Sequence, residues 1–163
     1  MKKTLANGTI FTIAHVLFGF GGNTGLLNKK QLKTRIAVRQ ALKFNHKVIS
    51  DAYNTINEMM QDIQKELFDE FLEADKATKT DEMIEVKEEF RDEFTAIYRM
   101  KLDELSAQTV DLEVQMIPED KYLAYAEQND GELTDAELDV LEVFVESTED
   151  TEEIEKVEGE VVE

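Results

Sequence analysis

The stretch that decides the fold is residues 29–74, KKQLKTRIAVRQALKFNHKVISDAYNTINEMMQDIQKELFDEFLEA. It contains neither proline nor glycine, the two residues that most often interrupt a helix. Apolar and aromatic residues recur along it at alternating spacings of four and three, which places them on one side of a helix. The members of this seam are Leu42, His46, Ile49, Tyr53, Ile56, Met60, Ile63 and Leu67.

A helix over the whole of residues 29–74 would be about 70 Å long at the usual rise per residue. One globular core cannot cover such a length, so we expect the helix either to kink or to project as an arm. The seam is the candidate interaction surface, because a continuous apolar ridge must be covered by another helix or by another chain.

A second helix is predicted over residues 81–107, after a polar turn at residues 75–81. Its apolar face is marked by Phe90, Phe94, Ile97 and Leu105. A short connection between two long helices favours an antiparallel hairpin in which the two apolar faces bury each other. That burial, at about 25 cal/mol per Å², would be the main stabilising contribution.

Residues 110–116 have the clearest strand pattern in the chain. Val, Leu, Val and Met alternate with Asp, Glu and Gln, which predicts one buried and one solvated face. Its partner is left open between residues 83–87, an extended N-terminal segment and the same strand of a second copy. Beyond it, Pro118 begins a short helix, and the capping box at residues 134–137 opens another.

Residues 9–20 fit either a strand or a helix. Their β-branched and aromatic residues favour a strand. The helical spacing of Ile10, Ile13 and Leu17 favours a helix, which is the interpretation we prefer. Four glycines within residues 19–25 then predict a loop.

These elements predict an α+β fold that is predominantly α: a long helical hairpin with a small β element and a C-terminal helix. A chain of 163 residues has the length of one domain. We place a single helical-hairpin-based domain at residues 1–145. Residues 146–163 are rich in acids and poor in apolar side chains, which predicts a disordered acidic tail.

Charge is distributed very unevenly along the chain, whose net charge is −19. Residues 1–50 hold nine of the 18 basic residues and no acidic residue, whereas residues 51–163 hold all 37 acids. One interpretation is internal pairing of basic and acidic segments, and the other is two binding faces of opposite sign. The candidate basic patch is Lys29, Lys30, Lys33, Arg35, Arg39, Lys43 and Lys47. Such a patch could neutralise phosphates, although internal pairing is the favoured interpretation.

No motif in the sequence points to catalysis. There is no cysteine, and neither His15 nor His46 belongs to a metal-ligand pattern. The glycines of residues 19–25 lack the Gly-Lys-Ser/Thr of a phosphate-binding loop. We therefore expect a protein without catalytic residues, metal or cofactor. The longest apolar run is too short to cross a membrane, so no membrane partner is expected.

Four stretches, taken in order, carry a resemblance to a known family. They are LANGTIFTIAHVL at residues 5–17, RIAVRQALKFN at residues 35–45, the strand at residues 110–117 and LTDAELDVLEVFVE at residues 133–146. Together they resemble a family of small phage and prophage proteins of Gram-positive bacteria that is known only as a domain of unknown function. The resemblance implies a viral, non-enzymatic gene product and a helix at residues 9–20.

Three functions follow as hypotheses. The first is a phage or prophage protein that acts by protein–protein interaction in virion structure or assembly. The second is an acidic nucleic-acid mimic that inhibits a host nuclease or defence protein. The third is nucleic-acid binding through residues 29–47. The expected partner is a protein, either a second copy, a virion protein or a host protein, and nucleic acid is less favoured. The expected location is the host cytoplasm or the virion.

Overall fold

The computed structural model describes residues 1–22, 25–29, 31–33 and 35–147. Residues 148–163 of the predicted tail, and Lys30 of the basic patch, lie outside the described residues. In chain order the main elements are β1 (Lys2–Ala6), α1 (Asn7–Phe18), α2 (Ile36–Glu73), β2 (Ala77–Lys79), β3 (Ile84–Val86), α3 (Arg91–Ala107), β4 (Thr109–Glu113), α4 (Glu119–Gln128) and α5 (Asp135–Leu141). Short 3-10 turns are η1 (Phe20–Gly22), η2 (Leu26–Asn28), η3 (Glu88–Phe90) and η4 (Glu142–Phe144). The predicted fold class, α+β and predominantly α, is confirmed.

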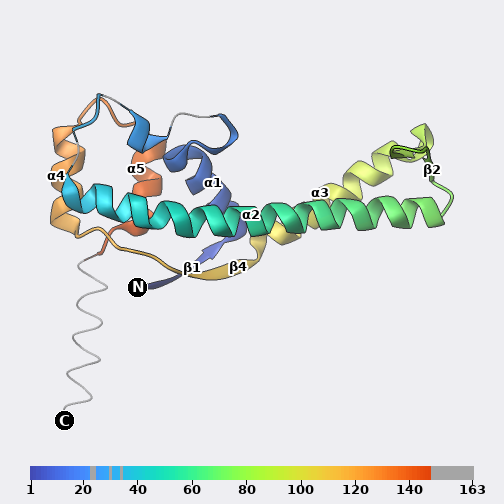
Figure 1. The fold of residues 1–163 in the computed structure, drawn as a ribbon, viewed down its shortest axis with the longest axis horizontal. Coiled ribbons are helices and arrows are strands. Elements are labelled where there is room, and N and C mark those ends of the chain that lie inside the picture. The colour runs from blue at the N-terminus through green and yellow to red at the C-terminus, as the bar shows by residue number, and fades with distance from the viewer. Residues whose placement is uncertain (23–24, 30, 34, 148–163) are drawn as a thin grey trace, which may run out of the picture.

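Helix α2 runs unbroken through the whole length of the structure (Figure 1). Its 38 residues give a length of about 57 Å. At one end it is surrounded by α1, α4, α5 and the β1–β4 sheet, and we call this body the head. At the other end only α3 and the β2–β3 hairpin accompany it, and we call residues 57–104 the arm. Helix α3 returns along α2, so the predicted helical hairpin is present.

The long helix begins at Ile36 and not at Lys29, which corrects the predicted start. Lys29 and residues 31–33 lie outside the helix and are held by tertiary contacts. The Asn129 side chain accepts a hydrogen bond from the Lys33 N–H at 2.7 Å and donates one to the Lys33 carbonyl at 2.9 Å. Lys29 is held by Glu137 at 2.7 Å. These partners outweigh the helix propensity of a Lys- and Gln-rich segment.

Helix α1 settles the choice left open for residues 9–20 in favour of the helix. Ile10, Ile13 and Leu17 are fully buried, as their helical spacing requires. The helix ends at Gly19, whose φ of 74° is a left-handed conformation that glycine adopts without steric cost.

Strands β1 and β4 form an antiparallel pair in which Lys3 lies opposite Leu112 and Leu5 lies opposite Val110. The partner of the predicted strand is therefore the extended N-terminal segment, one of the three alternatives. The alternation is confirmed, because Val114 is buried while Asp111 and Glu113 are exposed.

The tip of the arm differs from the prediction of a polar turn followed by one helix over residues 81–107. Residues 77–79 and 84–86 form a small antiparallel hairpin, and α3 begins only at Arg91. The hairpin places Ala77 and Val86 against Leu67 and Phe71 of α2. Burying these apolar side chains against the end of α2 stabilises the hairpin more than additional helical turns at the start of α3 would.

The two C-terminal helices, α4 and α5, each begin at a residue that the sequence singled out. The predicted capping box at the start of α5 is present, since Thr134 and Glu137 exchange hydrogen bonds between side chain and backbone. Burial of the Glu137 carboxylate opposes its ionisation, but the Lys29 ammonium and Thr134 outweigh this, so the pKa of Glu137 is lowered. Pro118 is the N-cap of α4, one residue earlier than the predicted first-turn position.

The hydrophobic interior consists of two separate clusters strung along α2. The head cluster contains Ile49, Ile56 and Phe144 among 20 buried residues. They come from β1, α1, η2, α2, the end of α3, the segment after β4, α4, α5 and η4. The arm cluster has only four buried residues, Leu67, Phe71, Ala77 and Val86. Aromatic side chains of α2, η3 and α3 pack around it, and the Phe68 and Phe94 ring centroids are 4.7 Å apart.

Candidate interaction surfaces

The predicted interaction seam is mainly interior, which corrects its assignment as an interaction surface. Leu42, Ile49, Ile56 and Leu67 are at most 3 % exposed. The first three belong to the head cluster with α1, and Leu67 belongs to the arm cluster. Tyr53, Met60 and Ile63 are half-buried, and only His46 is exposed. The chain therefore covers most of this ridge with its own helices.

His46 differs from the rest of the seam because its side chain is exposed at the edge of the head. Its ring meets Phe18 edge-on at 5.0 Å and Phe20 at 5.8 Å. His15 lies among aromatic rings as well, 5.9 Å from Tyr53. Among the described residues, no group of three or more His, Cys, Asp or Glu side chains is placed to hold a metal ion.

The predicted basic patch is divided in two. Lys29 is paired with Glu137 and Lys33 lies in the loop before α2. The other described members, Arg35, Arg39, Lys43 and Lys47, follow each other at intervals of four along the start of α2, and all are exposed. None of these four forms an ion pair among the described residues. Internal pairing therefore accounts for Lys29 and leaves this stripe exposed.

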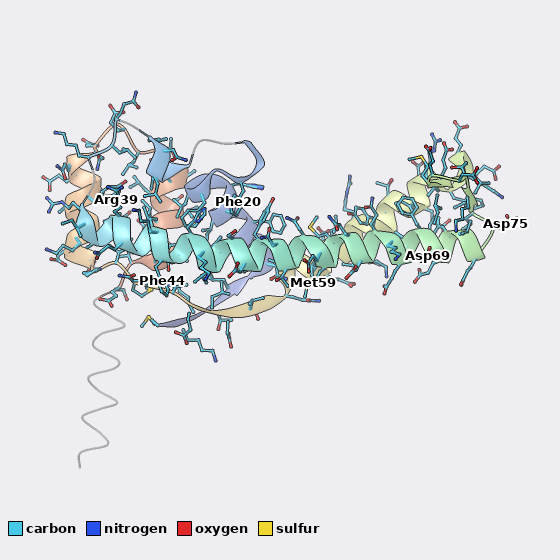
Figure 2. The ribbon with its side chains drawn as sticks, in the orientation of Figure 1. Phe20, Arg39, Phe44, Met59, Asp69 and Asp75 are labelled. Carbon is cyan, nitrogen blue, oxygen red and sulfur yellow. The ribbon has the colours of Figure 1, made fainter. Side chains whose placement is uncertain are left out.

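The other half of α2 carries a row of exposed acids. Glu58, Asp62, Glu66, Asp69 and Glu73 are spaced by three or four residues, so they share one side of the helix. Figure 2 shows Arg39 at the head end of the helix and Asp69 near the arm end. The sequence-wide charge split thus becomes a division between a basic head end and an acidic arm on a single helix.

A groove opens between the middle of α2 and strand β4, with a volume of about 520 Å³. Its walls are mostly apolar: Val48, Ala52 and Met59 lie on the α2 side, and Val110 and Leu112 on the β4 side. Met59 is 43 % exposed although it is a large apolar side chain. Figure 2 shows Met59 and Phe44 below α2, on the side where β4 runs. A groove of this size and lining is typical of a binding site.

Among the residues that the structure describes, one edge of strand β4 has no neighbouring strand, and Thr109 and Glu113 of β4 line the groove. In an antiparallel pair the backbone groups of successive residues point alternately to the partner and away from it. Val114 donates its N–H to the Met1 carbonyl, so the even-numbered residues of β4 face β1. The backbone groups of Thr109, Asp111 and Glu113 therefore face away, and Thr109 and Glu113 line the groove.

Asn7 lines the groove, and its side-chain oxygen accepts no hydrogen bond from the described residues. It is 2 % exposed, and its Nδ2 donates to the Leu105 carbonyl at 2.9 Å. Because a carbonyl must receive an N–H, this bond fixes the orientation of the amide. Its Oδ1 is buried and meets no donor among the described residues. A buried acceptor without a donor is costly, and such atoms often mark functional sites.

Asn45, which is fully buried on α2, binds the backbone just beyond β4. Its Nδ2 donates to the Gln115 carbonyl at 2.9 Å, and its Oδ1 accepts from the Gln115 N–H at 2.8 Å. This pair of bonds fastens the chain after β4 to α2. Apart from Gln108, the residues that line the groove belong to α1, α2 or β4, so its walls are helices and a strand.

Acidic side chains stand at the mouth of the groove. Asp51 lines it from α2, is exposed and forms no ion pair among the described residues. Glu113 lines it from β4 and lies 3.6 Å from the N-terminal ammonium. On the outer face of β4, the Thr4 hydroxyl and then Lys2 lower the pKa of Asp111. The groove is thus apolar inside and negative at its rim.

Sequence reasoning missed the groove, although a weak signal existed. Val48, Ala52, Thr55 and Met59 repeat at spacings of four, three and four beside the main seam. They form a second, less apolar stripe, which amphipathic analysis assigns to the solvent boundary of the helix. Only the packing of β4 below α2 turns this stripe into one wall of a groove.

Comparisons with protein-family models, with curated proteins and with solved structures find no match to this chain. Within the described ranges, no helix is both long enough and apolar enough to cross a membrane.

Proposed function

We propose that the protein is a non-enzymatic protein-interaction subunit that binds a partner chain in the α2–β4 groove. The single observation that carries this proposal is an apolar groove of about 520 Å³ beside an unpaired strand edge. A monomeric chain gains nothing from leaving Met59, Val110 and Leu112 partly exposed beside unpaired backbone groups, whereas a partner would cover both.

We further propose, from the resemblance of its sequence to small phage and prophage proteins, that this subunit acts in virion structure or assembly. The shape supports this role, because the arm extends α2 well beyond the head (Figure 1). A head that binds one component and a helical arm that reaches another would suit an assembly protein. The location that follows is the host cytoplasm or the virion.

A photo-crosslinking amino acid at Met59 tests the proposal in infected host cells. The matched control carries the same amino acid at Asn54, which is exposed on the same helix and does not line the groove. We expect crosslinks to one protein from position 59 and none from position 54. Equal crosslinking from both positions, or none together with a monomer in light scattering, would contradict the proposal.

The crosslinked protein is then purified and titrated by calorimetry against two variants. Ala52→Glu places a charge in the groove, and we expect it to weaken binding at least about tenfold, a loss of about 1.4 kcal/mol. Asn54→Glu adds the same charge outside the groove and should leave the affinity unchanged. Both residues lie within α2, so circular dichroism checks that the helix is retained.

A second candidate function rests on the acidic row of the arm, from Glu58 to Glu73. The row presents regularly spaced carboxylates on one side of a helix, as an imitation of a nucleic-acid backbone requires. The net charge of −19 favours this imitation over nucleic-acid binding by the basic stripe. Its test is competition with DNA for a host nuclease. Neutralising Asp62, Glu66, Asp69 and Glu73 should abolish competition, while neutralising four acids of α3 should not.

A further inference from the structure

We infer that the occupant of the α2–β4 groove is an extended segment of another protein, with alternating apolar side chains and flanking lysine or arginine, that adds to the sheet as a third strand beside β4. The inference rests on the proposed function, since it names the class of partner that the groove accepts.

The free edge of β4 favours an extended segment over a helix. Thr109, Asp111 and Glu113 direct their backbone groups away from β1, along the length of the groove. A neighbouring strand lies about 4.8 Å from β4 and pairs with these groups. A helix satisfies its own backbone groups and would leave the edge unpaired.

The position of the groove sets the side-chain pattern of the partner. Val110 and Leu112 lie on the face of β4 that lines the groove, below α2. In a new strand beside β4, every second side chain would lie on that same face, next to Val48, Ala52 and Met59. Those positions require apolar residues, whereas the alternate positions face solvent.

Two polar features add specificity. Asp51 and Glu113 make the rim of the groove negative, so basic residues that flank the apolar positions are attracted and acidic ones are repelled. The buried Oδ1 of Asn7, which also lines the groove, accepts no hydrogen bond from the described residues. A partner N–H or hydroxyl that reaches it would satisfy the acceptor that the chain itself leaves without a donor.

The test uses a pool of synthetic peptides of about nine residues, the length of a strand. Each is acetylated and amidated, has lysine at both ends, and alternates threonine with valine, isoleucine, leucine or phenylalanine. Methionine methyl NMR reports where they bind. Met59 lines the groove, whereas Met83 and Met100, which are exposed on the arm, serve as internal controls. We expect at least one peptide to shift Met59 and to leave Met83 and Met100 unchanged.

Two modifications separate strand addition from simple filling of the groove. N-methylation of the alternate peptide amides that face β4 should weaken binding about tenfold. In the protein, Asp111→Pro removes one N–H of the free edge, where proline is tolerated, and should weaken binding similarly. Asp111→Thr keeps the N–H and should not weaken binding. If Asp111→Pro does not fold, the N-methylated peptides still decide the question.

Four other results would overturn strand addition of a foreign segment, and one of them would also overturn the proposed function. Binding at Met59 that ignores N-methylation and Asp111→Pro would overturn strand addition and leave the proposed function standing. Failure of every peptide to move Met59, while the uncharged apolar dye Nile red does, would overturn the inference and make the groove a small-molecule site. Self-association that is lost in Asp111→Pro would make the occupant a second copy. No response at Met59 to peptide or dye, with no crosslink at that position, would overturn the proposed function as well.

Discussion

The head and the arm share one helix but differ in how that helix is covered. In the head, α2 is packed within a cluster of 20 buried hydrophobic residues, whereas the arm has four. At the start of the arm, Met60 and Ile63 are only half-buried and pack against the head cluster. The backbone hydrogen bonds of α2 are continuous, but the apolar burial that stabilises it is concentrated at one end. A continuous helix therefore need not be a single unit of stability.

The largest effect should come from emptying the centre of the head. Phe144 is fully buried, so Phe144→Ala leaves a cavity and should lower the free energy of unfolding by about 3–5 kcal/mol. Urea unfolding followed by circular dichroism measures it. A loss below about 1 kcal/mol would be typical of a surface site and would remove the distinction between head and arm.

A smaller loss is expected where the head is fastened to strand β4. Asn45→Ala removes both hydrogen bonds to Gln115 and should lower the free energy of unfolding by about 2–3 kcal/mol. Asn54→Ala, on the exposed side of the same helix, should change it by at most about 0.5 kcal/mol. Equal values for the two variants would show that the bonds to Gln115 do not stabilise the attachment of this segment to α2.

The Lys29–Glu137 pair should give the head a pH-dependent contribution. The folded-state pKa of Glu137 is lowered, so the pair stabilises the protein above the ordinary glutamate pKa, and this stabilisation is lost as pH falls through the folded-state value. Lys29→Met should cost about 1–2 kcal/mol at neutral pH, because Lys29 is partly exposed. The difference from wild type should shrink as pH falls below about 4.3. Lys43→Met, which removes an exposed and unpaired lysine, should show no such change.

The smallest effect on global stability is expected in the arm. Phe71 is 4 % exposed, and Phe71→Ala matches the Phe144 substitution in chemistry. We expect it to lower the global free energy of unfolding by less than about 1 kcal/mol, because the arm opens before the head. Amide exchange and proteolysis at residues 57–104 should nevertheless become much faster. A loss equal to that of Phe144→Ala, with unchanged exchange in the arm, would show that the two clusters unfold together.

Local patterns were sufficient for several parts of the fold. The heptad spacing from Leu42 to Leu67 predicted the long helix, because burial repeats with the helical turn. The alternation around Leu112 predicted β4, and the residues Thr134 to Glu137 predicted the cap of α5. Each of these signals lies within one segment, so no distant contact was needed to find it.

The remaining features depend on residues far apart in the chain. Residues 29–35 have a helical composition, but Glu137 binds Lys29 and Asn129 binds the Lys33 backbone, and both lysines lie before the helix. Strand β1 has no alternating pattern and exists because β4 lies beside it. The groove has the same origin, since Val48 and Ala52 acquire their role only when β4 packs below them. No spacing within one segment encodes such an encounter.

The most direct measurement of the central claim is amide hydrogen exchange along β4, with and without the bound partner or peptide. In the free protein we predict an alternating pattern, with fast exchange at Thr109, Asp111 and Glu113 and slow exchange at Val110 and Leu112. Binding should slow the three edge amides and leave the exposed surface of the arm unchanged. Edge amides that are already protected in the free protein, or that stay fast in the complex, would contradict it.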